Sequence, residues 1–291
     1  MTALKAVGLL LLAILCFDAM SVMIRTMIRA GYSAQELSAY RNLFGVLPSL
    51  LLMIRTGELR LKGTNLYIPQ WRLAVLRGLV VALAQVFFFS AIGLLDLATV
   101  SALGQTSGLF VVALSVIFLK ERVGIWRWSA LAIGFGGAML ILQPGSDAFT
   151  AAALLPICAA ACYSFSMITV RKFDRTVSNA LLYLYSSGAA AVGAILLAAI
   201  TTEFSAIASI GDAAFILTLA LIGGTGVLLM MLAYRMAAPS ILAPFGYFGL
   251  VTSFSFGWYF FGEFPVETLF PGVLLIVAGG AMVLWRENRR A

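Results

Sequence analysis

The chain has 291 residues, of which 62% are hydrophobic and only 11% are charged, and its formal net charge is +7. Ordinary globular domains carry about 25% charged residues, so this composition excludes a soluble domain and indicates a membrane protein. The basic residues lie in short links between apolar runs. That distribution is typical of membrane topology and not of a nucleic-acid-binding face, so no nucleic-acid partner is expected.

The sequence offers few residues that could bind a metal or a cofactor. The chain contains no histidine, and Cys16, Cys158 and Cys162 all lie inside apolar runs, where cysteine acts as a small hydrophobe. This excludes a Cys/His zinc site and every histidine-based catalytic triad. The apolar runs also lack the paired carboxylates or Ser/Lys dyad that an intramembrane enzyme needs. We therefore expect no cofactor, no metal and no enzymatic activity.

The apolar runs predict an all-α membrane protein, because a spanning helix needs about 20 mostly apolar residues. The first run carries Asp18 and lacks a clear small-residue cleavage site, so we interpret it as a retained helix and not a signal peptide. Ten spanning helices joined by short links are expected in one compact domain: Leu4–Ile24, Ala34–Ile54, Leu73–Leu94, Thr99–Leu119, Trp126–Leu142, Ala151–Val170, Ala180–Ile200, Ala213–Met236, Ile241–Phe261 and Thr268–Trp285.

Lysine and arginine in the links predict the orientation, because cytoplasmic links are enriched in positive charge. With the N-terminus inside, the outer links carry only Arg25 and Arg29 of the basic residues. The other side holds Lys5, Arg55, Arg60, Lys62, Arg72, Lys120, Arg122, Arg127, Arg171, Lys172, Arg175, Arg235, Arg286, Arg289 and Arg290. Both termini are therefore expected in the cytoplasm.

A weak internal repeat relates the two halves of the chain. Residues 91–121 align without gaps on residues 233–263, with identities at Ala91/Ala233, Gly104/Gly246, Phe118/Phe260 and Glu121/Glu263. Each stretch is followed by the tetrapeptide Gly-Gly-Ala-Met, at residues 136–139 and 279–282. Duplication explains these matches best and predicts five-helix halves at 1–145 and 146–291. Five is odd, so the halves would be inverted, as in many secondary transporters with a central cavity between the repeats.

These features resemble the drug/metabolite transporter superfamily, and within it the EamA-type exporters. The resemblance rests on the ten runs in two halves, the small-residue-rich fourth and ninth runs that end near Glu121 and Glu263, and the Gly-Gly-Ala runs that follow. It implies a basket of helices around a central cavity, alternating access, and a location in a bacterial cytoplasmic membrane. Aromatic amino-acid exporters are the members that the chain resembles most.

Two ionisable residues within the apolar runs are candidates for function, because charge is costly inside a membrane. Asp18 lies about 10 Å below the outer end of the first run, and Arg41 about 10 Å below the outer end of the second, at about 1.5 Å per helical residue. Their similar depth predicts an ion pair between them. Asp18 would serve proton coupling or bind a substrate amine, or the pair would be structural.

Two amides offer neutral polar contacts at depth, Gln85 in the third run and Gln105 in the fourth. An amide both donates and accepts hydrogen bonds, which suits a zwitterionic or polar solute. The alternative is a packing role between helices, which Gly104 and Gly108 around Gln105 favour.

Aromatic and apolar residues within the spans would complete an amino-acid site. Tyr163 and Tyr247 lie inside spans and not at their ends, and Tyr247 is the repeat counterpart of Gln105. Phe17, Phe88 and Met230 are further substrate-binding candidates. Each of these residues could instead pack against lipid or a neighbouring helix.

The sequence therefore predicts a secondary transporter that exports small metabolites, most specifically aromatic or apolar amino acids. Uptake or exchange of a nucleoside-like metabolite such as S-adenosylmethionine is the alternative within transport, and a membrane assembly subunit is the alternative outside it. The expected partners are a small-molecule substrate and the lipid bilayer. A monomer is compatible with the sequence, which does not fix the oligomeric state, the direction of transport or the driving ion.

Overall fold

The computed structural model describes residues 2–55, 57, 68–119, 125–142, 150–169, 172–173, 177, 179–202, 207–236, 245–246, 248–264 and 266–288. Within these ranges every regular element is a helix. They are α1 (Thr2–Arg29), α2 (Ala34–Gly45), α3 (Leu47–Arg55), α4 (Trp71–Leu94), α5 (Leu97–Gly104), α6 (Ser107–Leu119), α7 (Ile125–Leu142), η1 (Ala151–Ala153), α8 (Leu154–Thr169), α9 (Asn179–Thr201), α10 (Ile210–Met236), α12 (Phe248–Phe261), α13 (Val266–Leu269) and α14 (Gly272–Asn288).

The helices follow the predicted apolar runs closely. In the described part of the chain, six helical stretches are long and apolar enough to cross a membrane. Many large apolar side chains on them are exposed, such as Leu12, Val192 and Leu217. Exposed apolar surface on long apolar helices is what a lipid-facing bundle requires. The chain is an all-helical, multi-span membrane protein.

Two predicted single spans are interrupted. The run Ala34–Ile54 forms α2 and α3, which meet at Val46, two residues before Pro48. The run Thr99–Leu119 forms α5 and α6, separated by Gln105 and Thr106. At this second break the Thr106 hydroxyl donates to the Leu103 carbonyl at 2.6 Å, and the Thr106 and Leu109 amides bond three residues back. Such side-chain competition with the backbone bends a helix.

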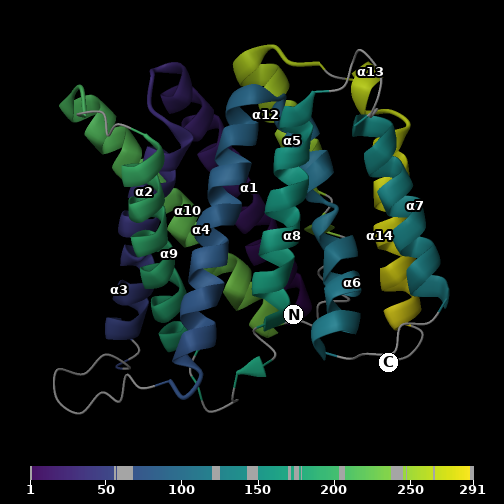
Figure 1. Ribbon diagram of the computed structural model, residues 1–291, viewed down its shortest axis with the longest axis horizontal. Helices are drawn as coiled ribbons and strands as arrows, with labels where there is room; N and C mark the ends of the chain where they lie inside the picture. The colour runs from purple at the N-terminus through teal and green to yellow at the C-terminus, as the bar shows by residue number, and fades with distance from the viewer. Residues whose placement is uncertain are drawn as a thin grey trace.

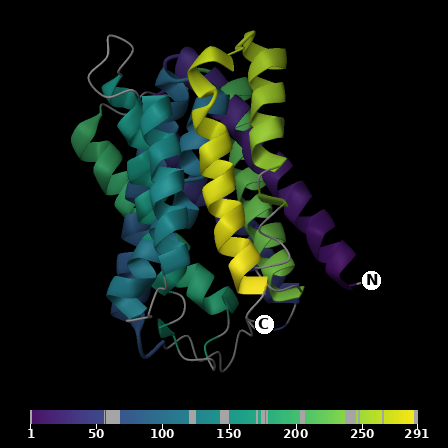
Figure 2. The ribbon, with the colours of Figure 1, turned by 90° about the vertical axis from the view of Figure 1, so that its right-hand side faces the viewer.

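The helices form a bundle in which α7 and α14 pair at one edge and α2, α3 and α9 lie at the opposite edge (Figure 1). Between these edges α1 packs on α10, and α4 packs on both α8 and α9. The described start of α1 and the end of α14 lie at the same end of the bundle, as both views show (Figure 2). An even number of crossings is consistent with this arrangement.

The Gly-Gly-Ala-Met stretch of α7 has a packing role. A Cβ atom on Gly137 would lie 2.5 Å from the Gly272 carbonyl oxygen of α14, whereas one on Gly136 would meet nothing within 4 Å. Gly137 therefore allows the backbones of α7 and α14 to touch, as small residues do between membrane helices. On α14 the reciprocal close approach is at Gly272, where a Cβ atom would lie 2.6 Å from the Gly137 carbonyl oxygen.

Candidate functional site

A cavity of about 240 Å³ lies among α1, α4, α5, α8 and α12, together with the break between α5 and α6. Its position between helices fits the usual place of small-molecule sites in helical bundles. Phe17, Asp18, Phe88, Gln105 and Tyr163 line it, so the structure brings five sequence-predicted residues together. The remaining lining residues are Ser21, Ile92, Leu97, Val100, Ser101, Gly104, Ser107, Pro156, Ala160 and Ser253.

Aromatic rings form one wall of this cavity. Phe88 of α4 and Tyr163 of α8 meet edge to face, with ring centroids 6.5 Å apart and an interplanar angle of 75°. Phe17 of α1 lines the same cavity. Edge-to-face pairs fix ring orientation and leave ring faces free to contact a ligand. The wall therefore suits a flat or apolar part of a small molecule.

Asp18 supplies negative charge to the cavity and is held by α12. Its two carboxylate oxygens accept hydrogen bonds from the hydroxyls of Thr252 and Ser253, the latter at 2.7 Å. The predicted ion pair with Arg41 is not formed. The reason is the direction of the side chains: Asp18 faces α12, whereas Arg41 lies beside Gly223 of α10.

Arg41 belongs to a buried polar cluster between α2 and α4. Its Nη1 donates to the Asn42 side-chain oxygen at 3.2 Å, while its Nε is buried without an acceptor. Asn42 and Ser38 both donate to the side-chain oxygen of Gln85. Arg41 is 7% exposed and Gln85 4% exposed. We call these four residues the α2–α4 polar cluster.

The break between α5 and α6 connects the cavity to the chain before α12. Gln105 lies in this break, and its side-chain amide approaches the Gly246 carbonyl oxygen at 3.5 Å. Tyr247, the predicted counterpart of Gln105, lies outside the described residues. Met230 does not line the cavity but packs against the buried cluster of Ala6, Leu10, Ile14 and Ala233.

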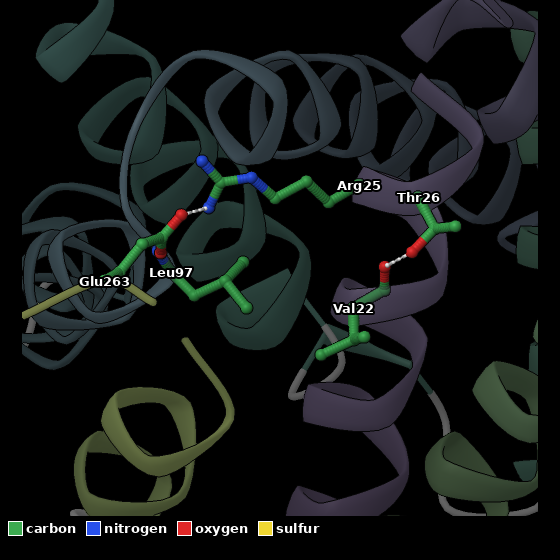
Figure 3. A network of polar contacts seen from close by, with 5 residues as sticks. All are labelled: Val22, Arg25, Thr26, Leu97 and Glu263. Carbon is green, nitrogen blue, oxygen red and sulfur yellow. Dashed lines mark hydrogen bonds and ion pairs between the residues drawn. The ribbon is translucent and has the colours of Figure 1, made fainter. Parts of the chain in front are cut away.

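A buried ion pair lies near the end of α1 and just after the end of α12. Arg25 of α1 points at the Glu263 carboxylate, beside the first residue of α5 (Figure 3). Glu263 also accepts the Leu97 backbone N–H at 3.0 Å, and Leu97 lines the cavity. Burial raises the pKa of the Glu263 carboxyl, while the Leu97 N–H and the Arg25 charge oppose that shift. The pair thus ties α1, α5 and the segment after α12 together.

Several of these contacts were missed by the sequence reasoning. The Arg25–Glu263 pair joins residues assigned to separate links, and the hydroxyls of Thr252 and Ser253 carry no signal of their own. Asn42 stood next to Arg41 in an apolar run, and a buried amide beside a buried charge is a detectable signal. Ser33 and Glu36 form a capping box at the start of α2, with the pattern Ser-x-x-Glu that marks helix starts.

Comparisons with known proteins agree with this architecture. Residues 4–143 match the EamA-like transporter family. A solved crystal structure with 18% sequence identity aligns with a TM-score of 0.66, covering 98% of this chain and 97% of that one. At that identity the likeness shows the fold alone.

Relatives with a named function are transporters. A riboflavin transporter of Rhizobium johnstonii is 34% identical over 65% of this chain, and that match spans 62% of the relative's own length. An S-adenosylmethionine uptake transporter of Rickettsia conorii is 24% identical, covering 99% of this chain and 95% of the relative. A pseudopaline exporter of Pseudomonas aeruginosa is 26% identical over 94% of both chains.

The fold, the cavity and these relatives define a multi-span secondary transporter of small metabolites, and not an enzyme. Residues 4–143, just under half of the chain, are similar to the EamA-like transporter family, and the transporter relatives extend this similarity over 94–99% of the chain. The substrates named for these relatives give no specific support to the narrower likeness with aromatic amino-acid exporters.

Proposed function

We propose that the chain exports amino acids with aromatic or apolar side chains, by alternating access from the cavity. The observation that carries this proposal is the combination of an aromatic wall with the Asp18 carboxylate in one small cavity. The wall contacts the apolar side chain of the substrate. Asp18 faces its ammonium group or carries the coupling proton.

The size of the cavity supports an amino acid over a larger solute. Pockets that hold drug-sized ligands measure about 300–1,000 Å³. The cavity measures about 240 Å³, below that range. Riboflavin or S-adenosylmethionine would require it to widen.

The second candidate is uptake or exchange of a larger metabolite, and the relatives favour it. Transporters of riboflavin and of S-adenosylmethionine are among them. The aromatic wall suits an isoalloxazine or adenine ring as well as a phenyl ring. These solutes therefore belong in the same transport test.

We also propose that the chain is an inverted repeat of residues 1–145 and 146–291. Exchange of the halves turns α1 into α8, α4 into α10 and α5–α6 into α12. Under this correspondence the contact of α1 with α10 is equivalent to the contact of α8 with α4, and both contacts are observed. The contact of α6 with α8 is equivalent to the contact of α12 with α1, and both of these are also observed. The pair α7–α14 maps onto itself.

Purified protein in liposomes tests the function. Vesicles are loaded with phenylalanine, leucine, riboflavin or S-adenosylmethionine, and efflux is followed with and without an imposed pH gradient. Saturable efflux of the amino acids supports the leading proposal. Efflux of riboflavin or S-adenosylmethionine alone moves the function to the second candidate. Failure of the whole panel, with folded protein in the vesicles, contradicts both.

We also propose that both termini lie in the cytoplasm and that the link between α9 and α10 lies outside. Single cysteines at Thr2 and at Ser209 test this topology, in a background with alanine at Cys16, Cys158 and Cys162. An impermeant thiol reagent added to whole cells should label position 209 and leave position 2 unlabelled until the cells are opened. Labelling of position 2 in intact cells would contradict cytoplasmic termini.

A further inference from the structure

The α2–α4 polar cluster lies next to the cavity along one face of α4. Phe88 and Ile92 line the cavity, and Gln85 lies one turn before Phe88 on the same face. The Gln85 side chain holds Asn42 of α2, and Asn42 accepts from Arg41. The aromatic wall is therefore followed, one helical turn along α4, by hydrogen bonds that lead from Gln85 through Asn42 to a guanidinium.

In the described part of the chain this guanidinium has no counter-charge within ion-pair distance. Among the described residues, the ion pair that forms joins Arg25 and Glu263, and Arg41 has no carboxylate partner. One of its nitrogens, Nε, is buried and has no hydrogen-bond acceptor, and the whole residue is only 7% exposed. A buried charge without a partner is costly, so its retention calls for a ligand or a function.

The surroundings of Arg41 favour an anion. Tyr163, which lines the cavity, and Tyr183 of α9 both lie within electrostatic reach of its charge. The charge of Arg77 of α4 also reaches Tyr183, and Arg77 donates to the Ser166 carbonyl at 2.8 Å and to the Ser186 hydroxyl at 2.9 Å. Two guanidiniums with neutral partners make this part of the bundle positive.

We propose that Arg41 is the anion-binding end of the substrate site and that it binds the carboxylate of the transported solute. Arginine pairs with carboxylates through charge-assisted, often bidentate hydrogen bonds. With Asp18 at the other charged position of the site, the substrate class becomes zwitterionic: an apolar body that carries both an ammonium and a carboxylate. This inference rests on the proposed transport function and narrows its substrates.

Matched substrates with and without a carboxylate test the proposal. Uptake of the transported panel member into proteoliposomes is measured in the presence of competing solutes. The competitors form two pairs that differ by a carboxylate: phenylalanine with 2-phenylethylamine, and S-adenosylmethionine with its decarboxylated form. In the wild type the carboxylate-bearing member should compete better. Arg41→Gln should weaken that member by about ten- to a hundredfold, the usual range for a hydrogen bond to a charged group. It should leave the decarboxylated member unchanged, and Arg41→Lys should restore part of the difference.

A second measurement keeps the inference testable if no panel member is transported. Tyr163→Cys is placed in the background without Cys16, Cys158 and Cys162, and its reaction with an anionic and a cationic methanethiosulfonate is timed. With Arg41 present, the anionic reagent should be favoured about tenfold over its ratio at an exposed control cysteine at Ser209. Arg41→Gln should abolish that preference.

The outcomes separate this inference from the proposed function. Transport of phenylalanine that is unchanged in Arg41→Gln, or reduced equally for both members of a pair, overturns the anion site and leaves transport standing. If no panel member is transported but position 163 shows an anion preference that depends on Arg41, the anion site is supported and the panel of substrates is rejected. No transport and no such preference overturns both.

Discussion

The two buried charged regions of this bundle are organised in different ways. At one end, Arg25 and Glu263 satisfy each other, and Glu263 also accepts the Leu97 N–H. In the middle, Asp18 is held by the hydroxyls of Thr252 and Ser253, and Arg41 by the amide of Asn42, with no opposite charge at either in the described structure. A charge already paired within the protein has little to gain from a ligand, whereas one held by neutral groups retains much of its field.

From this difference we propose that the paired end is structural and that the unpaired middle recognises the substrate. The paired end connects three segments of the bundle. The unpaired middle combines opposite charges from α1 and α2 with the aromatic wall. The following variants test this division, beginning with the largest expected effect.

Glu263→Ala should destabilise the protein most. It leaves Arg25 buried beside Phe261 without its carboxylate, and breaking a buried ion pair costs about 3–5 kcal/mol. Thermal unfolding in detergent measures the loss. The matched control is the double variant Arg25→Met with Glu263→Leu, which removes both charges and should recover most of the stability. Equal losses in the single and double variants would show that the pair itself is not the cause.

Gln85→Leu should have an intermediate effect on stability and also lower transport. The change leaves the Ser38 hydroxyl and one Asn42 amide contact without their acceptor, and a buried unsatisfied polar group costs about 1–3 kcal/mol. Unfolding in detergent and efflux from proteoliposomes measure the two effects.

Gln85→Glu provides the matched control because it keeps both acceptor contacts and adds a negative charge near Arg41. If Arg41 binds a substrate carboxylate, this added charge should lower transport even where stability is retained. Normal transport in both variants would remove the polar cluster from the substrate path.

Asp18→Asn should leave stability nearly unchanged but lower transport about tenfold, equivalent to about 1.4 kcal/mol. The amide still accepts a hydroxyl hydrogen bond, while the charge that faces the substrate amine or carries the proton is lost. Efflux at several imposed pH gradients measures the change. Thr252→Val is the control for the hydroxyl contact alone. Wild-type efflux by Asp18→Asn at every gradient would remove the charge from the mechanism.

The spans were predictable because apolar length sets them, and α4, α7, α9 and α10 begin and end within a few residues of expectation. The direction of each side chain around the helix axis was not predictable, because it depends on how α1, α2, α10 and α12 pack. For this reason the sequence assigned Asp18 and Arg41 to the same depth but wrongly to each other.

The interruptions show a second limit. The break at Gln105 depends on the Thr106 hydroxyl competing for the Leu103 carbonyl, which local composition alone does not require. The break in the second span had a visible signal in Pro48, because proline disrupts the hydrogen bond to the residue four before it. Of the five predicted residues that line the cavity, Gln105 lies at a helix break, and nothing in the sequence indicated that break.

Met230→Leu should have the smallest effect on stability and transport, and it serves as the control for the other variants. The sequence placed Met230 with the substrate-binding residues, but it packs against Ala6, Leu10, Ile14 and Ala233, away from both charged regions. A volume-conserving exchange of this kind costs less than about 1.5 kcal/mol, and efflux should equal that of the wild type. Phe88→Leu is the informative counterpart, because it removes half of the edge-to-face pair with Tyr163 inside the cavity. A loss of transport in Met230→Leu that matches the loss in Phe88→Leu would mean that the substrate path runs between α1 and α10, and the site assigned to the middle of the bundle would have to move.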